Sequence, residues 1–184
     1  MPISPGSGDP HIGEVIASHP PVPTDEVELD ACLVRVHDDV ALSNVVREHP
    51  VSRRPRDLDD ESEPIIVHKR GINGPGLTEG LLDPTPESLR VDLPQIGGPP
   101  IELDYLRGWF VYGTDSTHPF ARAGDSGSIV VDEDDCVVGM VVALRSETPY
   151  TPRPGDPAFV VPIVSVLEGL GVRLVGPDRP CTLC

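Results

Sequence analysis

A serine between two glycines is the residue of this sequence best suited to nucleophilic chemistry. Ser126 lies in Gly124-Asp125-Ser126-Gly127-Ser128, and the apolar run 129–131 follows directly. A serine hydroxyl attacks a carbonyl only when a base removes its proton and nearby N–H groups stabilise the oxyanion. A glycine-flanked turn presents backbone N–H groups to one point and lets a substrate approach closely. The pattern predicts Ser126 as nucleophile, with the N–H groups of Gly124 and Ser126 as oxyanion hole; the alternative is an ordinary Gly-Asp-Ser-Gly turn.

This segment resembles the nucleophile motif of the chymotrypsin-like (trypsin-fold) serine peptidases, in which GDSG[GS] leads into an apolar strand. The V-x-G strand that follows in that family is matched by Val137-Val138-Gly139. The stretch from His68 to Gly80 resembles the K-x-G-x-x-[ST]-G-x-T-x-G hairpin of intracellular and bacterial branches, which include the plant Narrow Leaf 1-like proteins. The resemblance covers about residues 12–175. It implies an all-β, chymotrypsin-like fold and hydrolysis of peptide bonds.

The resemblance also implies roles for three further residues. Asp30, in Leu29-Asp30-Ala31-Cys32-Leu33, matches the family's D-[AI]-x-[LI] and would be the acid that orients a histidine; the alternative is an exposed aspartate at a strand start. Phe120, six residues before the serine, would lie at the bottom of the substrate pocket, which disfavours cleavage after Lys or Arg. In secreted members the aspartate equivalent to Asp125 pairs with a new N-terminus after cleavage. No R-[IV]-[IV]-G-G cleavage site appears here, so we expect Asp125 instead to cap the serine loop through backbone N–H groups.

The general base is the missing member of this set. The family's histidine precedes the acid, after a segment such as [ST]-A-x-H, and only His11 and His19 precede Asp30 here. Neither has that context, and residues 12–17 resemble the strand that follows the histidine segment. The other four histidines come in the wrong chain order: His37, His49, His68 and His118. Three interpretations stay open: an incomplete protease chain, a pseudoprotease that binds peptides, and an unfamiliar use of one of these histidines.

The elements that must position these residues are almost all strands. Short runs rich in Val, Ile and Leu predict strands at 12–17, 29–36, 65–70, 77–83, 101–112, 128–131, 136–144, 158–161 and 172–175. Pro162 starts the one helical pattern, which ends at Leu170. Many short strands separated by Gly and Pro turns favour a barrel or sandwich. We expect a complete C-terminal barrel, a partial N-terminal barrel and a short C-terminal helix.

The domain organisation follows from composition along the chain. We expect a disordered N-terminus at 1–11, the remnant of the first barrel with the acid at 12–48, an exposed linker at 49–63, the second barrel with the serine at 64–176, and a flexible tail at 177–184. The Pro-rich stretch 84–100 reads as a long surface loop. A first barrel without its leading strands would expose strand edges, so a partner chain or an upstream segment is expected to complete it.

Charge and cysteine content narrow the function classes. The 184 residues carry 14 Lys and Arg against 30 Asp and Glu, a net charge of −16, which argues against nucleic acid or an anionic membrane as partner and leaves a peptide or protein substrate. No apolar run is long enough to span a bilayer, and no signal peptide is visible. Cys32 and Cys136 read as core residues, and Cys181 and Cys184 as a tail pair, without a disulfide framework. We therefore expect an intracellular protein without metal or cofactor.

Overall fold

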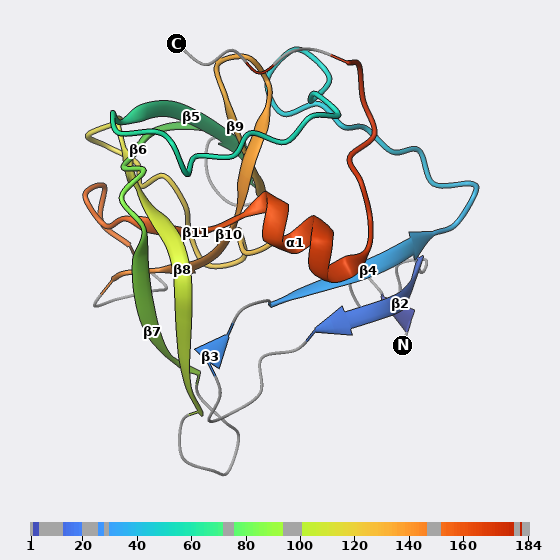
Figure 1. Ribbon diagram of the computed structural model, residues 1–184, viewed down its shortest axis with the longest axis horizontal. Coiled ribbons are helices and arrows are strands. Elements are labelled where there is room, and N and C mark those ends of the chain that lie inside the picture. The colour runs from blue at the N-terminus through green and yellow to red at the C-terminus, as the bar shows by residue number, and fades with distance from the viewer. Residues whose placement is uncertain are drawn as a thin grey trace.

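The computed structural model describes residues 2–3, 13–19, 26–27, 30–71, 76–93, 101–146, 152–178 and 181 (Figure 1). Within these ranges the chain forms eleven strands and one helix: β1 (Pro2–Ile3), β2 (Gly13–His19), β3 (Glu26–Val27), β4 (Ala31–Val36), β5 (Ile65–Arg70), β6 (Leu77–Leu82), β7 (Glu87–Leu93), β8 (Ile101–Gly113), β9 (Ile129–Asp132), β10 (Val137–Leu144), β11 (Ala158–Pro162) and α1 (Ile163–Leu170). The prediction of a strand at 172–175 was wrong: these residues follow α1 and pair with no strand.

Six strands close into an antiparallel barrel. They follow the order β11-β10-β9-β5-β6-β8, and β8 pairs with β11 to complete the ring, with Phe110 opposite Phe159. Because the ring is closed, every strand of the barrel has a neighbouring strand on both sides for at least part of its length. The interior is filled by small and branched side chains that each strand directs inward, among them Val67, Val111 and Val130, all fully buried. The predicted all-β class, with a complete barrel and a short C-terminal helix, is confirmed.

Strand β8 is long enough to take part in two structures. Its second half belongs to the barrel, whereas its first half pairs with β7 and, at Asp104 and Tyr105, with β3. The expectation that 84–100 is a surface loop was wrong for Glu87–Leu93. In that strand Leu89 and Val91 are half-buried against the core, and Arg90 and Asp92 between them are exposed. This alternation has the two-residue period of a strand, which the surrounding prolines obscured.

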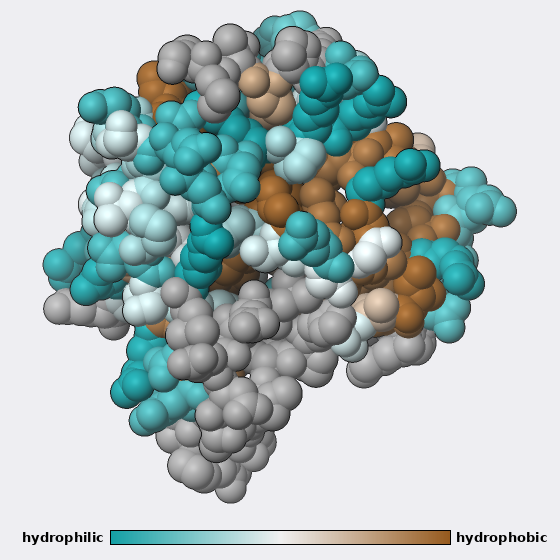
Figure 2. All heavy atoms as spheres, in the orientation of Figure 1, coloured by the Kyte–Doolittle hydropathy of each residue, from teal (hydrophilic) through white to brown (hydrophobic). Residues whose placement is uncertain are grey.

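A second, three-stranded sheet of order β1-β2-β4 lies beside the barrel, and α1 packs between the two (Figure 1). The helix contacts β10 and β11 on one side and β4 and β2 on the other. It begins after Pro162 and ends at Gly171, whose φ of +64° gives the left-handed cap that glycine favours. Apolar side chains gather on this face, over α1 and the adjoining part of β4 (Figure 2).

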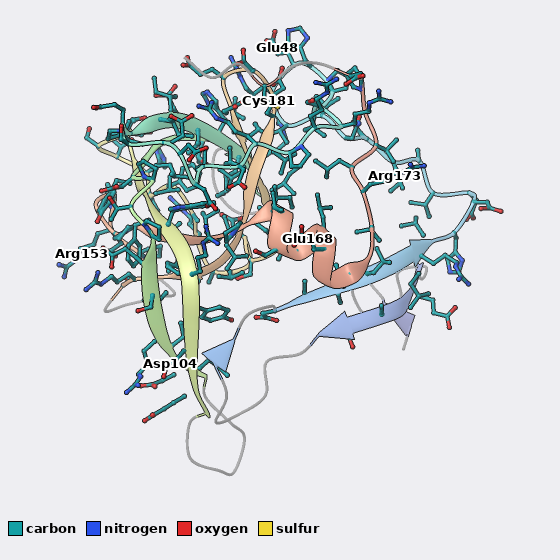
Figure 3. All side chains as sticks on the ribbon, viewed as in Figure 1. Glu48, Asp104, Arg153, Glu168, Arg173 and Cys181 are labelled. Atoms are coloured by element: carbon teal, nitrogen blue, oxygen red, sulfur yellow. A yellow bond between two sulfur atoms is a disulfide. The ribbon has the colours of Figure 1, made fainter. Side chains whose placement is uncertain are left out.

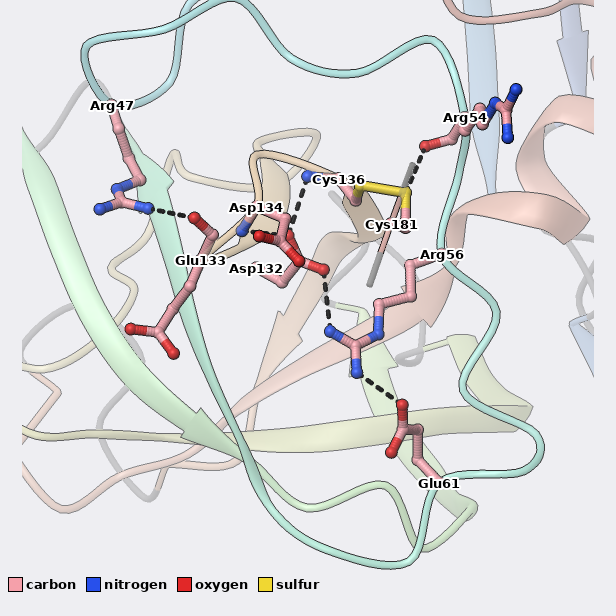
Figure 4. A network of polar contacts seen from close by, with 9 residues as sticks. All are labelled: Arg47, Arg54, Arg56, Glu61, Asp132, Glu133, Asp134, Cys136 and Cys181. Atoms are coloured by element: carbon pink, nitrogen blue, oxygen red, sulfur yellow. Dashed lines mark hydrogen bonds and ion pairs between the residues drawn. A yellow bond between two sulfur atoms is a disulfide. The ribbon is translucent and has the colours of Figure 1, made fainter. Parts of the chain in front are cut away.

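Part of the expected exposed linker at 49–63 packs against the barrel, although most of its residues are exposed. Val51, Ser52 and Leu58 are at most 3% exposed, and Pro55 bridges to Val137. Arg56 lies in the same segment, and its guanidinium bonds to Asp132 at 2.9 Å and to Glu61 at 2.5 Å (Figure 4). Composition suggested an exposed stretch because it is rich in charge, but here part of that charge is paired and the few apolar residues are buried.

The tail, predicted to be flexible, is tied to this segment and to the barrel. The chain after α1 passes Arg173 and is described as far as Asp178, and of the predicted tail Cys181 is also described (Figure 3). Asp178 forms ion pairs with Arg53 and Arg54, and Cys181 forms a disulfide with Cys136 at the β9–β10 turn. Cys136 is fully buried, as expected of a core residue, but the interpretation of Cys181 as part of a separate tail pair was wrong, and Cys32, also expected in the core, is exposed. The disulfide also weakens the prediction of an intracellular location, because that prediction depended in part on the lack of a disulfide framework. No helix among the described residues has the length and apolarity to cross a membrane.

Candidate active site

The serine loop lies between Pro119 and the start of β9, with the Ser126 side chain exposed. Its hydroxyl donates to the carbonyl of Val142 on β10 at 3.2 Å. Gly124 and Gly127 have φ values of +94° and +88°, a conformation that side chains with Cβ rarely adopt. A Cβ on Gly127 would meet no atom within 4 Å, so the backbone conformation, and not space, accounts for glycine there.

The amides of this loop divide into used and unused donors. The N–H of Asp125 donates to the carbonyl of Arg122 at 3.0 Å, and that of Gly127 donates to Val141 at 2.8 Å. Among the described residues, no acceptor is bonded to the N–H of Gly124 or of Ser126. These are the two amides that the sequence predicted as oxyanion hole, beside an exposed hydroxyl.

A buried ion pair between Lys69 and Asp125 holds the serine loop against β5. Asp125 is 1% exposed, and its Oδ2 accepts from Lys69 Nζ at 2.8 Å and from the backbone N–H of Arg122 at 3.0 Å. Lys69, on β5, is also fully buried. A Cβ on Gly71 would lie 2.2 Å from the Asp125 carboxylate, so glycine there makes room for this pair. The predicted bond to a backbone N–H is present, whereas sequence reasoning missed Lys69, the sole lysine of the chain.

Phe120 belongs to the barrel core. Its side chain is 1% exposed, its ring lies 5.6 Å from Lys69 Nζ, and its carbonyl accepts from the Thr78 hydroxyl at 2.8 Å. A shallow pocket nearby contains neither Phe120 nor Ser126; it is lined by Leu77, Thr78, Glu79, Asp115, His118 and Pro119. The expected place of Phe120 at the bottom of a substrate pocket stays a prediction.

Asp30 is attached to the barrel through a tyrosine. Its Oδ2 accepts from the hydroxyl of Tyr105 on β8 at 2.8 Å. Burial, together with the neighbouring carboxylate, raises the pKa of Tyr105 well above its ordinary value, so the phenol stays a donor. The Tyr105 ring packs against Phe159, with 6.2 Å between centroids, and Phe159 pairs with Ala143, the neighbour of Val142. A continuous set of contacts thus links Asp30 to the strand that receives the Ser126 hydroxyl.

The strand register brings one histidine of the sequence beside Asp30. In the antiparallel pair of β2 and β4, His19 lies opposite Ala31, the residue directly after Asp30. Opposed residues of such a pair have Cα atoms about 4.5–5.5 Å apart. The His19 side chain lies outside the described part of the chain, and so does all of His11. Sequence reasoning set His19 aside because only eleven residues separate it from Asp30, whereas the pairing of β2 with β4 brings the two positions to the adjoining ends of neighbouring strands.

The four other histidines have different surroundings. His37 and His49 are exposed, and His118 bonds to Asp115 at 2.9 Å. His68 is 7% exposed on β5, and burial together with the nearby Arg47 lowers its pKa. None of these four described side chains bonds to Ser126. The described residues also contain no group of three or more His, Cys, Asp or Glu side chains placed to hold a metal ion.

Comparison with known proteins supports the fold and goes no further. No protein-family model matches the chain, and no curated protein matches its sequence. One similar solved structure is that of a glutamic acid-specific serine protease, described as utilizing a novel histidine triad in substrate binding. The likeness has a TM-score of 0.57 at 15% identity and covers 94% of this chain and 78% of that chain. The chain therefore has a chymotrypsin-like fold.

Proposed function

We propose that this protein is a serine endopeptidase-like hydrolase in which Ser126 attacks the peptide carbonyl. The observation that carries the proposal is the serine loop itself: an exposed hydroxyl, two adjacent amides that no described residue uses, and a buried Lys69–Asp125 pair that holds the loop in shape. Preorganised N–H donors are worth most when they need no rearrangement as the oxyanion forms. The amides of Gly124 and Ser126 supply those donors.

We infer that His19 is the general base and Asp30 the acid that orients it. The imidazole takes the Ser126 proton as Oγ bonds to the carbonyl carbon, and it then gives that proton to the leaving amine as the C–N bond breaks. Water, activated by the same imidazole, hydrolyses the Ser126 ester. Asp30 accepts the Nδ1–H and stabilises the imidazolium. The bond donated by Tyr105 holds the Asp30 carboxylate in place during these steps.

An open edge of β10 offers a place for an extended substrate. On its far side β10 pairs with β9 only from Val137 to Met140, and the serine loop covers Val141. Among the described strands none pairs with that edge from Val142 to Leu144. An extended peptide can add to such an edge through main-chain hydrogen bonds, which would place its carbonyl beside Ser126.

A second candidate function is a pseudoprotease that binds peptides at this edge without cleaving them. It is favoured by the observed partner of Asp30, which is a tyrosine, and by the lack of contact between Ser126 and any described histidine side chain. Membership of the branch that includes the Narrow Leaf 1-like proteins is a proposal as well, supported by the sequence of the β5–β6 hairpin alone.

A fluorophosphonate probe distinguishes these functions, because it labels only activated serines. We expect labelling of the chain at 19.7 kDa, loss of the label in Ser126→Ala, and a large loss in His19→Gln and Asp30→Asn. His49→Gln, which changes an exposed histidine, is the matched control and should label normally. Absence of labelling in a folded chain would support the pseudoprotease. Normal labelling of His19→Gln would refute the assignment of the base.

We also propose that a partner chain or an upstream segment completes the first barrel. Several apolar side chains near the small sheet are exposed, with Leu42 at 75%, Val175 at 80% and Ile16 at 45%. Among the described residues, β4 pairs only with β2, so the other edge of β4 is free to pair with a further strand. Labelling of a native extract tests this idea, since a labelled species well above 19.7 kDa carrying the Ser126 peptide would show the longer chain.

A further inference from the structure

Two arginines near the serine loop carry charge that the rest of the protein does not neutralise. The chain has a net charge of −16, from 14 Lys and Arg against 30 Asp and Glu. Six basic side chains form ion pairs with Asp or Glu: Arg53, Arg54, Arg56, Lys69, Arg90 and Arg107. Arg122 and Arg145 form no ion pair with any described residue. Five other described arginines form none either, namely Arg35, Arg47, Arg70, Arg153 and Arg173, so what distinguishes Arg122 and Arg145 is their place in the chain on either side of the serine loop.

Arg145 lies at the end of the open edge of β10. It follows Val142, the acceptor of the Ser126 hydroxyl, by three residues, which is about 10 Å along a strand. Its backbone N–H donates to Pro157 at 3.0 Å, so the strand is still held to the barrel at this point. The guanidinium lies 5.3 Å from the centre of the Phe110 ring. Such a cation–π contact positions the charge without neutralising it.

The chain just beyond Arg145 is fixed by a carboxylate that is engaged elsewhere. Asp156 accepts from the Ser146 hydroxyl at 2.6 Å and from the backbone N–H of Arg153 at 2.8 Å. These two bonds lower the pKa of Asp156, so it remains an acceptor for this turn across the neutral range. The turn holds the end of β10 in place, and its acid has partners other than the Arg145 guanidinium.

Arg122 lies at the start of the serine loop. It lies four residues before Ser126, and its backbone N–H donates to Asp125 at 3.0 Å, which fixes the main chain at the entrance to the loop. Its side chain is half-buried. A peptide on the β10 edge with its carbonyl at Ser126 would have Arg145 at the end of that edge, and Arg122 belongs to the loop that carries the serine.

We propose that Arg145, with Arg122 in support, makes this site select peptides that carry a carboxylate side chain within about three residues of the bond at Ser126. The proposal rests on the proposed peptide site and names its substrate class. An acidic side chain would gain a charge-assisted hydrogen bond from a guanidinium that has no competing carboxylate, whereas a neutral or basic one would not. The net negative charge of the chain opposes the binding of acidic peptides, so the selectivity requires cations at the site such as these two.

The test measures binding, so that it does not depend on turnover. Ser126→Ala would be titrated with fluorescent peptides of one sequence in which Glu, Gln or Lys is placed in turn at each of the three positions on either side of a central residue. At one position or more we expect Glu peptides to bind about tenfold more tightly than Gln peptides, the effect of one partly exposed charge-assisted bond. The preference should shrink as salt is raised.

Arginine variants identify the source of the preference. Arg145→Gln should abolish most of it, and Arg122→Gln should reduce it. Arg173→Gln is the matched control: it removes the same charge from an exposed arginine on the tail beyond α1 (Figure 3) and should leave the preference unchanged. Thermal unfolding of each variant shows that it is folded.

Several outcomes would overturn the selectivity. Equal binding of Glu and Gln peptides, no binding of any peptide, or a Glu preference that survives both Arg145→Gln and Arg122→Gln would each do so. Failure of the hydrolase proposal is visible separately, because fluorophosphonate labelling does not require an acidic side chain. If the protein is labelled but shows no Glu preference, Ser126 remains the proposed nucleophile and the selectivity is refuted. If it prefers Glu peptides but is not labelled, the selectivity stands and the hydrolase proposal is refuted.

Discussion

Replacing Lys69 by methionine removes the cation from beneath the serine loop and keeps a side chain of similar length. Lys69 and Asp125 are each about 1% exposed and lie 2.8 Å apart. Removing one member of a buried pair leaves the other charge without compensation, at a cost of about 3–5 kcal/mol. A domain of this size is stable by only about 5–15 kcal/mol, so Lys69→Met should lose a large part of its stability.

The same variant should slow the chemistry at Ser126. Asp125 accepts the backbone N–H of Arg122 only while its carboxylate stays in position, and that bond shapes the turn bearing the Gly124 and Ser126 amides. We expect the labelling rate with a fluorophosphonate to fall in Lys69→Met. Urea unfolding gives the stability, and time-resolved labelling gives the reactivity.

A double-mutant cycle separates the pair from its burial. Lys69→Met combined with Asp125→Asn leaves no buried charge, so it should recover part of the stability that either single change loses. Arg90→Gln is the control, because its pair with Asp104 is 64% and 44% exposed and should contribute less than about 1 kcal/mol. A loss below about 1 kcal/mol in Lys69→Met, or additive effects in the double variant, would refute the reasoning.

Three further perturbations give defined results. Replacing Cys136 and Cys181 together by serine opens a link between residues 45 apart and should cost about 4 kcal/mol in urea unfolding; an unchanged midpoint under reducing conditions would argue against the bond. Gly127→Ala forces a side chain to a φ of +88° and should cost roughly 1–2 kcal/mol while slowing fluorophosphonate labelling, although no atom blocks the methyl group. His68 has its pKa lowered by burial and by Arg47, so the unfolded chain binds the proton more readily. Stability should therefore fall as pH drops from about 6.5 toward the lowered value, and His68→Gln should flatten that part of the profile in thermal unfolding across pH.

Local sequence was sufficient for most of the barrel strands and for the serine loop. The strand predicted at 65–70 is β5 to the residue, and the helix expected from Pro162 to Leu170 begins one residue later. These features depend on neighbours in the chain: the period of apolar residues, the fixed φ of proline, and glycines that accept positive φ. The pattern around Ser126 is local in the same sense, because one turn presents both its hydroxyl and its amides.

Relations between distant residues came only with the tertiary structure. The disulfide from Cys136 to Cys181 was not foreseen, because spacing does not state which cysteines meet. The pairing of Lys69 with Asp125 and the burial of Arg56 likewise required the barrel to close before a buried charge could find its partner. The position of His19 opposite Ala31 depends on the register of two strands, a long-range property that adjacent residues do not encode. Chain composition and local pattern determined the strands and the serine loop, and the packing of strand on strand decided which charges, sulfurs and histidines lie beside them.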